Sequence, residues 1–217
     1  MPSVFNDPSI WFSIIAAVVS IKALLQTSKQ MILSNKQHLF SERLNAYLIS
    51  MGLMRLYDEN MKYIEESINQ VDTEYADIEF IFTAMTNNTY LEQLCSVIDH
   101  PEENPWHKEF LIKLEDMQNI ATKIVFIFNN SKKLERFILS YKDVLYKMYI
   151  YHRSFKKIGE ISQDSTFYNS EVTDCQDIEK QRRGELSKSF KTLKSAYDEL
   201  KDDKTMETIS TQIQLLE

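Results

Sequence analysis

The scarcity of glycine is the feature that most limits the folds this chain can adopt. Only three glycines occur among 217 residues, whereas ordinary usage of about 7% would give roughly fifteen. Phosphate-binding loops and dinucleotide-binding turns need clustered glycines, and hairpin-rich β-folds need glycine-containing turns. All four prolines lie in the first half of the chain, up to Pro105, so long segments carry no helix breaker. We therefore expect an all-α protein.

The segment from Ile10 to Leu25 is apolar apart from Lys22 and two serines. At 1.5 Å per residue it spans about 24–27 Å, slightly less than a hydrocarbon core of about 30 Å. A lysine near the end of such a span can extend its ammonium group to the interface. We expect a transmembrane anchor within residues 1–28, whose lipid-facing side chains are Ile10, Trp11, Phe12, Ile14, Ile15, Val18, Val19 and Ile21.

Two other interpretations of this segment stay open, a cleaved signal peptide and a buried helix of a soluble bundle. A signal peptide normally begins with basic residues, but the only charged residue before this run is the acidic Asp7. A buried helix is less favoured because the apolar run is short and Lys22 interrupts it. For an anchor, the bases that follow the span decide its orientation. They are Lys22, Lys29, Lys36 and Arg43. They predict a single-pass protein of the cell membrane with its C-terminal domain in the cytoplasm.

Apolar residues recur at helical spacing through most of the remaining chain. The span is expected to continue as a helix to about residue 70, and further helices are expected over 104–127 and 131–159. The pattern over 77–86 fits a strand as well as a helix, and we expect a helix because the chain offers it no partner strand. Asn104 and Pro105 match an N-cap followed by a first helical residue. We expect an antiparallel helical bundle over residues 29–159, a polar loop over 160–177 and a C-terminal amphipathic helix over 178–217.

The C-terminal helix carries a short heptad seam, with apolar residues at alternating spacings of four and three. Such a seam either packs on the bundle or pairs with a second helix. Its residues are Leu186, Phe190, Leu193, Tyr197 and Leu200.

The net charge of −7 argues against a general nucleic-acid-binding protein, because such proteins normally carry a basic surface. Residues 131–158 nevertheless contain eight basic and two acidic residues, a local net charge of +6. This helix could contact anionic lipid, nucleic acid or an acidic protein, or could be an ordinary solvated face. The candidate contacts are Lys132, Lys133, Arg136, Lys147, Arg153 and Lys157.

No pattern of catalytic or metal-binding residues stands out. Cys95 and Cys175 are eighty positions apart and show no zinc-type spacing. His100 and His107 lie with three carboxylates in one nine-residue loop, residues 99–107, but the two histidines lack the helical spacing of a metal site. We therefore expect no enzyme activity, no cofactor and no small-molecule substrate.

Two motifs carry a resemblance to a protein family. The runs from Lys36 to Tyr47 and from Asn104 to Glu115 resemble small membrane proteins of unknown function from low-GC Gram-positive bacteria. The resemblance implies one N-terminal span and a cytosolic helical bundle, and it carries no catalytic residues.

Together these observations predict a membrane-anchored, non-enzymatic interaction or regulatory module, with a protein partner or a second copy of itself. A role in bacterial defence or stress is a hypothesis from the architecture. One alternative is a soluble or peripheral protein that binds anionic lipid or nucleic acid through residues 131–158. Another is an oligomeric pore, because Ser13 and Ser20 lie on one face of the N-terminal helix and could join neighbouring helices.

Overall fold

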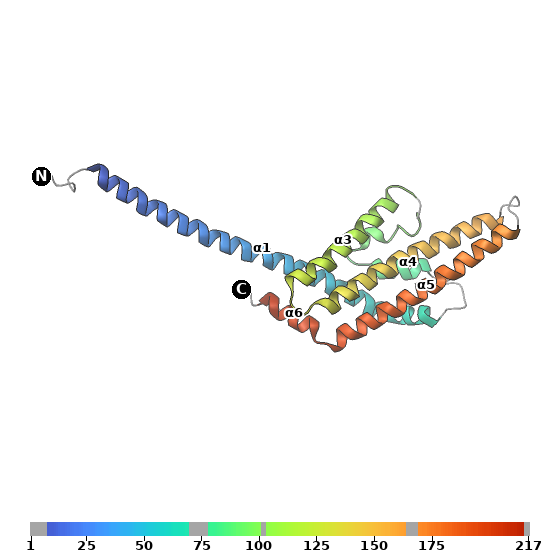
Figure 1. Cartoon of the computed structure of the whole chain (residues 1–217). Coiled ribbons are helices and arrows are strands. Elements are labelled where there is room, and N and C mark those ends of the chain that lie inside the picture. Colours follow the sequence, from blue (N-terminus) through green and yellow to red (C-terminus); the bar gives the residue numbers. More distant parts are fainter. Residues whose placement is uncertain (1–7, 70–77, 101–102, 164–168, 215–217) are drawn as a thin grey trace. The chain divides into compact units, whose positions relative to one another are not determined.

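The computed structural model describes residues 8–69, 78–100, 103–163 and 169–214. Figure 1 shows that these residues are mainly helical. In chain order the helices are α1 (Pro8–Asn69), α2 (Ile78–Thr86), the 3₁₀ helix η2 (Glu92–Leu94), α3 (Trp106–Ile127), α4 (Lys132–Gln163), α5 (Asn169–Asp202) and α6 (Thr205–Gln214). The described ranges contain no strand, and the prediction of an all-α fold is confirmed.

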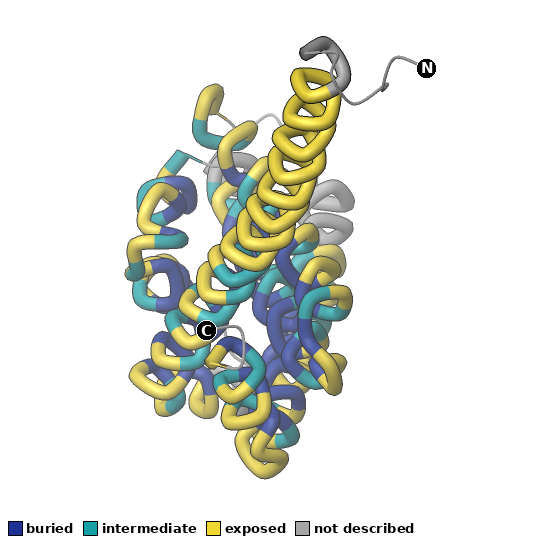
Figure 2. The backbone as a smooth tube through the Cα atoms, turned by 90° about the vertical axis from the view of Figure 1, so that its left-hand side faces the viewer, coloured by how far each residue is buried: buried dark blue, intermediate teal, exposed yellow. Residues whose placement is uncertain are grey.

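The first helix belongs to two compact units of the chain. One unit holds α1 up to Glu42, and the other begins at Arg43 and contains the helical bundle. In the first unit every side chain from Trp11 to His38 is exposed, as the yellow N-terminal part of the tube in Figure 2 shows. In the second unit, α1 contributes several residues to the core. The predicted continuation of the first helix to about residue 70 is confirmed.

The core of the bundle is rich in aromatic side chains. α4 packs along α5 and α3 packs along α4. The ring of Tyr57 in α1 stacks on that of Tyr197 in α5, with centroids 4.2 Å apart. The ring centroid of Phe137 in α4 lies 5.9 Å from that of Tyr197, and all three rings are buried. Aromatic pairs at such distances stabilise a core beyond the area they bury, so this cluster joins three helices.

The short apolar segment before the central loop is helical, as expected. The hydroxyl of Tyr141 in α4 donates to the carbonyl of Met85 at the end of α2, at 2.7 Å. Burial raises the pKa of this phenol well above its ordinary value of 10, so it remains a neutral donor. The bond ties α2 to α4 inside the core.

The start of α3 differs from the sequence prediction. Asn104 was expected as the N-cap, but Pro105 occupies that position and makes no side-chain capping bond. The helix begins at Trp106 instead. Glu109 donates its backbone N–H to the Pro105 carbonyl at 3.0 Å in the first turn of this helix, so the expected N-cap at Asn104 is wrong by one residue.

The predicted boundaries of the C-terminal half are also corrected. Residues 160–163 continue α4 and residues 169–177 begin α5, so the predicted loop over 160–177 is wrong there; residues 164–168 lie outside the described residues. A polar segment without glycine or proline can form a helix. The sequence does not reveal such a helix, because it lacks apolar residues at helical spacing. The predicted single helix over 178–217 is wrong as well, because α5 ends at Asp202 and α6 begins at Thr205.

Candidate functional site

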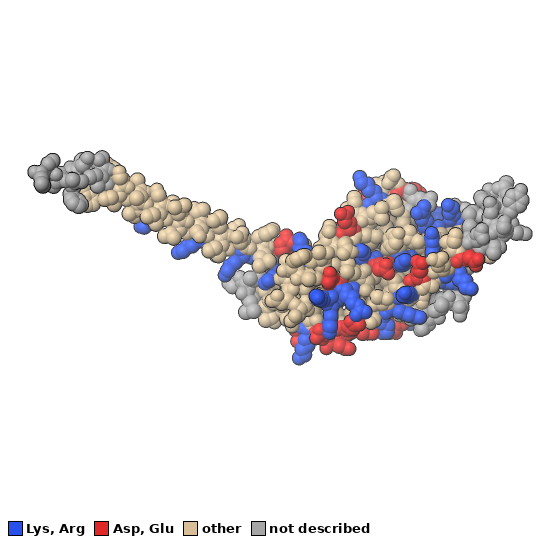
Figure 3. Space-filling model, viewed as in Figure 1, with Lys and Arg blue, Asp and Glu red and all other residues tan. Residues whose placement is uncertain are grey.

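The first candidate site is the apolar part of α1. The predicted lipid-facing side chains from Trp11 to Ile21 are all exposed, from 47% for Ile14 to 72% for Phe12; the side chain of Ile10 lies outside the described residues. An 18-residue stretch of α1 has a mean hydropathy of 1.5 and is 0% buried. Figure 3 shows this part of the helix as mostly neutral surface with a few basic side chains. By length and composition it is long and apolar enough to cross a membrane.

Several bases of α4 contact acids of the neighbouring helices. Lys133 Nζ lies 2.6 Å from Asp203 Oδ2, and the same α4 face places Arg136 next to Glu199 at 2.5 Å. Lys147 Nζ lies 2.9 Å from Glu185 Oε2. That hydrogen bond raises the pKa of Lys147 and lowers the pKa of Glu185. Three of the six candidate anion contacts therefore hold α4 to the segment that follows it, as an ordinary bundle face would.

The remaining bases of this group lie at opposite ends of α4. Arg153 and Lys157 line a cavity of about 300 Å³, together with Arg182 of α5. Arg182 NH1 also donates to the carbonyl of Ile150 at 3.3 Å. Lys132 lies at the other end of the helix, beside Lys133. The six bases thus form no continuous stripe, and their role as an anion-binding face stays a prediction.

The heptad seam of α5 faces the interior of its own bundle. Its five residues Leu186, Phe190, Leu193, Tyr197 and Leu200 are each no more than 1% exposed. Their partners include the buried rings of Tyr57 and Phe137. Of the two interpretations, packing on the bundle is the one seen here, and the seam offers a second chain no free surface in this conformation.

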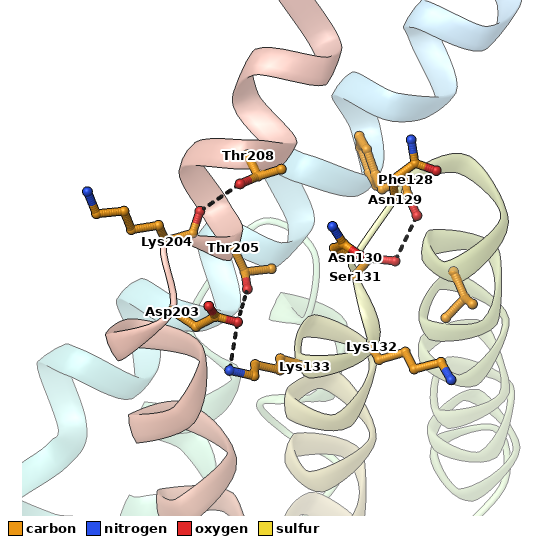
Figure 4. A pocket seen from close by; sticks show the side chains of 11 residues that line it. Phe128, Asn129, Asn130, Ser131, Lys132, Lys133, Asp203, Lys204, Thr205 and Thr208 are labelled. Atoms are coloured by element: carbon orange, nitrogen blue, oxygen red, sulfur yellow. Dashed lines mark hydrogen bonds and ion pairs between the residues drawn. The ribbon is translucent and has the colours of Figure 1, made fainter.

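A polar cavity of about 610 Å³ lies where two helix connections meet. One is the turn from α3 to α4, and the other is the turn from α5 to α6 (Figure 4). Asn130 adopts a left-handed backbone conformation with φ 58°, which asparagine tolerates better than most residues. The Ser131 hydroxyl donates to the carbonyls of Ile124 and Phe128, both at 3.1 Å. These features fix the tight turn that forms one wall of the cavity.

The opposite wall is the beginning of α6. The Asp203 carboxylate accepts hydrogen bonds from the Thr205 hydroxyl at 3.2 Å and from Lys133. The bond from Lys133 is the main reason that the pKa of Asp203 falls below its usual range. Asp203 is therefore ionised at neutral pH and ties the start of α6 to α4.

A polar cluster fastens α1 and α6 to the same turn. Arg43 Nε donates to the carbonyl of Ile127 at 2.8 Å, and its NH1 donates to the carbonyl of Gln212 at 3.1 Å. The Gln212 side chain in turn exchanges hydrogen bonds with the backbone N–H and carbonyl of Asn129, at 2.9 and 3.2 Å. Sequence reasoning gave Arg43 only a role in membrane orientation. Its partners are backbone atoms far away in the chain, which no local pattern could reveal.

The histidines of the central loop contact different partners. His100 Nδ1 lies 3.3 Å from Glu103 Oε1, whereas His107 Nδ1 lies 2.6 Å from the Tyr149 hydroxyl. Among the described residues, no group of three His, Cys, Asp or Glu side chains is close enough together to hold a metal ion. Cys95 is a free thiol near the Thr86 hydroxyl, at 3.4 Å. These residues are placed as parts of the packing between helices.

No family model matches the chain, and no curated protein or solved structure matches it either. The resemblance to small membrane proteins of Gram-positive bacteria therefore rests on its two sequence motifs alone.

Proposed function

We propose that this chain is a single-span protein of the cell membrane whose cytoplasmic bundle acts by binding a protein partner or a second copy of itself. The observation that carries the proposal is the exposure of α1. Side chains from Trp11 to Leu33 include many large apolar residues, and all of them are exposed. A helix that is apolar on all sides is normally buried in protein or in lipid. Lipid is the environment that this segment would need.

The charges around the apolar segment support the proposed orientation. No acidic residue occurs between Asp7 and Glu42, whereas Lys22, Lys29 and Lys36 follow the most apolar stretch. Basic residues close to a span are retained on the cytoplasmic side. The bundle would therefore lie in the cytoplasm and the residues before the span outside.

The bundle itself supports a binding role rather than catalysis. Several of its ion pairs join neighbouring helices, as Lys147 to Glu185 and Lys194 to Glu65 show. The phenols of Tyr57 and Tyr141 are buried in the core, where burial raises the pKa of each. Both are therefore packing groups of the core, as expected for a bundle that serves as a scaffold for docking.

The test is membrane fractionation of the full chain with a C-terminal tag. We expect the protein to stay in the membrane pellet after a carbonate wash, and the tag to be protected from protease added outside intact cells. Release of the unmodified chain by carbonate would contradict the anchor. Digestion of the tag would contradict the orientation.

A pair of variants makes the same test specific. Val18→Asp with Val19→Asp places two carboxylates in the span, at a cost of about 2.5–3.5 kcal/mol each, and should release the chain from the membrane. Leu44→Asp with Leu48→Asp makes the same change at exposed positions of α1 beyond the span. This control should remain in the pellet.

The alternatives from the sequence make different predictions in the same experiments. A peripheral protein that binds through α4 would be soluble without detergent, and its binding to anionic lipid would weaken as salt rises. A pore would make liposomes leak. The pore model relied on Ser13 and Ser20, and the Ser20 hydroxyl donates to the Ala16 carbonyl of its own helix at 2.8 Å.

A further inference from the structure

The polar cavity between the α3–α4 and α5–α6 turns is the strongest unassigned feature of the bundle. Its volume of about 610 Å³ lies within the range of small-molecule sites, about 300–1,000 Å³. It combines an apolar wall, formed by Val125 and Phe128, with amide, hydroxyl and ammonium groups. That mixture of surfaces suits a small polar molecule better than a single ion.

The charge of the cavity lining is positive. Three lysines line it, Lys132, Lys133 and Lys204, against a single carboxylate, Asp203. Lys133 already neutralises Asp203 through the 2.6 Å contact. The net charge of +2 belongs to Lys132 and Lys204, and it stands out in a chain whose overall charge is −7.

The backbone adds further donors on both sides of the cavity. Hydrogen bonds from Glu135 to Ser131 and from Thr208 to Lys204 mark the first turns of α4 and α6. The first N–H groups of a helix have no acceptor within the helix. Residues of both first turns line this one cavity. The partial positive charge at the N-terminus of each helix therefore adds to the charge of the lysines.

We propose that this cavity binds a small phosphorylated molecule, whose phosphate is held by Lys132 and Lys204. Phosphate carries the negative charge and the several acceptor oxygens that two ammonium groups can share. The apolar wall at Val125 and Phe128 accommodates the remainder of the molecule. The phosphate could belong to a soluble metabolite or to a lipid headgroup, and the chemistry of recognition is the same for both.

The lysines must move for this ligand to bind, which provides a direct readout. In Figure 4 the side chains of Lys132 and Lys204 point away from each other on opposite sides of the cavity. Both residues are exposed, and the lysine stem is flexible. Their ammonium groups can therefore turn inward around a phosphate. In doing so they would become less reactive toward an acylating reagent.

The experiment compares acetylation of individual lysines in the full chain, measured by mass spectrometry. In the first arm the chain is in neutral detergent micelles, with and without pyrophosphate and with ionic strength matched by sodium chloride. In the second arm it is in nanodiscs of phosphatidylcholine alone or with phosphatidic acid. We expect acetylation of Lys132 and Lys204 to fall at least about threefold in one arm, because a charged hydrogen bond to phosphate withdraws the amine from reaction.

The two arms separate the sources of the phosphate. Protection by pyrophosphate in micelles identifies a soluble ligand, and protection only in the nanodiscs that contain phosphatidic acid identifies a headgroup. Lys180 and Lys188, which are exposed on α5, are the internal reference and should not change. Equal acetylation of Lys132 and Lys204 in all conditions would overturn the proposal.

Paired variants confirm that the cavity is the site. Lys132→Gln with Lys204→Gln should weaken pyrophosphate or headgroup binding at least about tenfold, measured by calorimetry in the arm that gave protection. Lys180→Gln with Lys188→Gln removes the same charge elsewhere and should leave binding unchanged. Equal loss in both pairs would contradict a site and indicate a general effect of charge. The micelle arm needs no membrane, so it stands even if the proposed anchor fails.

Discussion

Arg43 in α1 donates a hydrogen bond to the carbonyl of Ile127, 84 positions later in the chain, at 2.8 Å. Ile127 is the last residue of α3, where carbonyl groups lack N–H donors within the helix. The same guanidinium reaches the carbonyl of Gln212 in α6 and lies 5.7 Å from the centre of the Phe128 ring. The side chain of Arg43 thus joins α1, at the first residue of the bundle unit, to α3, to α6 and to the turn beside the lysine-lined cavity.

Replacing this arginine should weaken the bundle measurably. Arg43→Met keeps the aliphatic stem but leaves two part-buried carbonyls without their charged donor. Hydrogen bonds to charged groups make a net contribution of about 1.5–3 kcal/mol each, and water can reach part of these two part-buried carbonyls in the variant, so we expect a loss of about 2 kcal/mol in the free energy of unfolding. Urea denaturation of the full chain in detergent, followed by circular dichroism, measures it.

The control for this prediction lies on the same helix. Arg55 contacts Glu59 one turn later, and the two side chains are 69% and 58% exposed. Such surface pairs contribute less than about 0.5 kcal/mol, so Arg55→Met should change little. If the two variants had the same free energy of unfolding, the contacts of Arg43 would not stabilise the bundle.

The elements of this fold could be predicted where a local signal exists. The scarcity of glycine, the proline-free first segment and the apolar spacing of α3 and α4 predicted the helix class and most helix positions. The helix boundaries near residues 160–177 could not be predicted. No glycine or proline occurs between Gly159 and Gly184 to mark a helix end, and the polar residues there show no apolar spacing that would indicate a helix. Gly159 was expected to end α4, yet the helix continues to Gln163.

The candidate sites were harder to predict, for a different physical reason. The positions of Lys132 and Lys133 were identified from charge alone, but their neighbour Lys204 lies some seventy positions later. Only the packing of α6 against the α3–α4 turn brings these residues to one cavity. The acids that neutralise Arg136 and Lys147 are likewise on α5. A charge pattern within one helix does not show which partner helix shares its surface.

The heptad seam of α5 should be required for stability and not for association. Leu193 is 0% exposed, and Leu193→Ala should cost about 2–5 kcal/mol through lost burial and the cavity it leaves. Ile178 on the same helix is 47% exposed, and Ile178→Ala should cost less than about 1 kcal/mol. Urea denaturation compares the two. A seam variant that changed the oligomeric state at unchanged stability would instead support pairing between chains.

The contact between Lys147 and Glu185 should be a modest, salt-sensitive link between α4 and α5. The side chains are 28% and 42% exposed, so solvent screens their attraction. A double-mutant cycle with Lys147→Gln and Glu185→Gln should give a coupling of about 0.2–1 kcal/mol, which falls as sodium chloride is raised. A zero coupling at low salt would mean that Lys147 is free for an external partner.

The stability of the bundle should decrease in mildly acidic solution because of His152. Burial lowers the pKa of this imidazole below its ordinary value of 6.5, against the opposing effect of Glu79, whose Oε1 lies 3.4 Å from Nε2. The unfolded chain therefore binds a proton at a higher pH than the folded chain does. The stabilising contribution is complete above about pH 6.5 and is lost as pH falls from there toward the folded-state pKa, with a slope of at most about 1.4 kcal/mol per pH unit.

Urea denaturation at several pH values between 7.5 and 5.5 tests this effect. His152→Gln keeps a neutral polar side chain and should flatten the pH dependence, whereas His38→Gln, at an exposed position of α1, should leave it as in the unmodified chain. The lowered pKa values of Glu185 and Asp203 act at lower pH, because the contribution of a carboxylate is lost only as pH falls through its folded-state pKa. Identical pH profiles for His152→Gln and the unmodified chain would show that the buried imidazole is not the group that titrates.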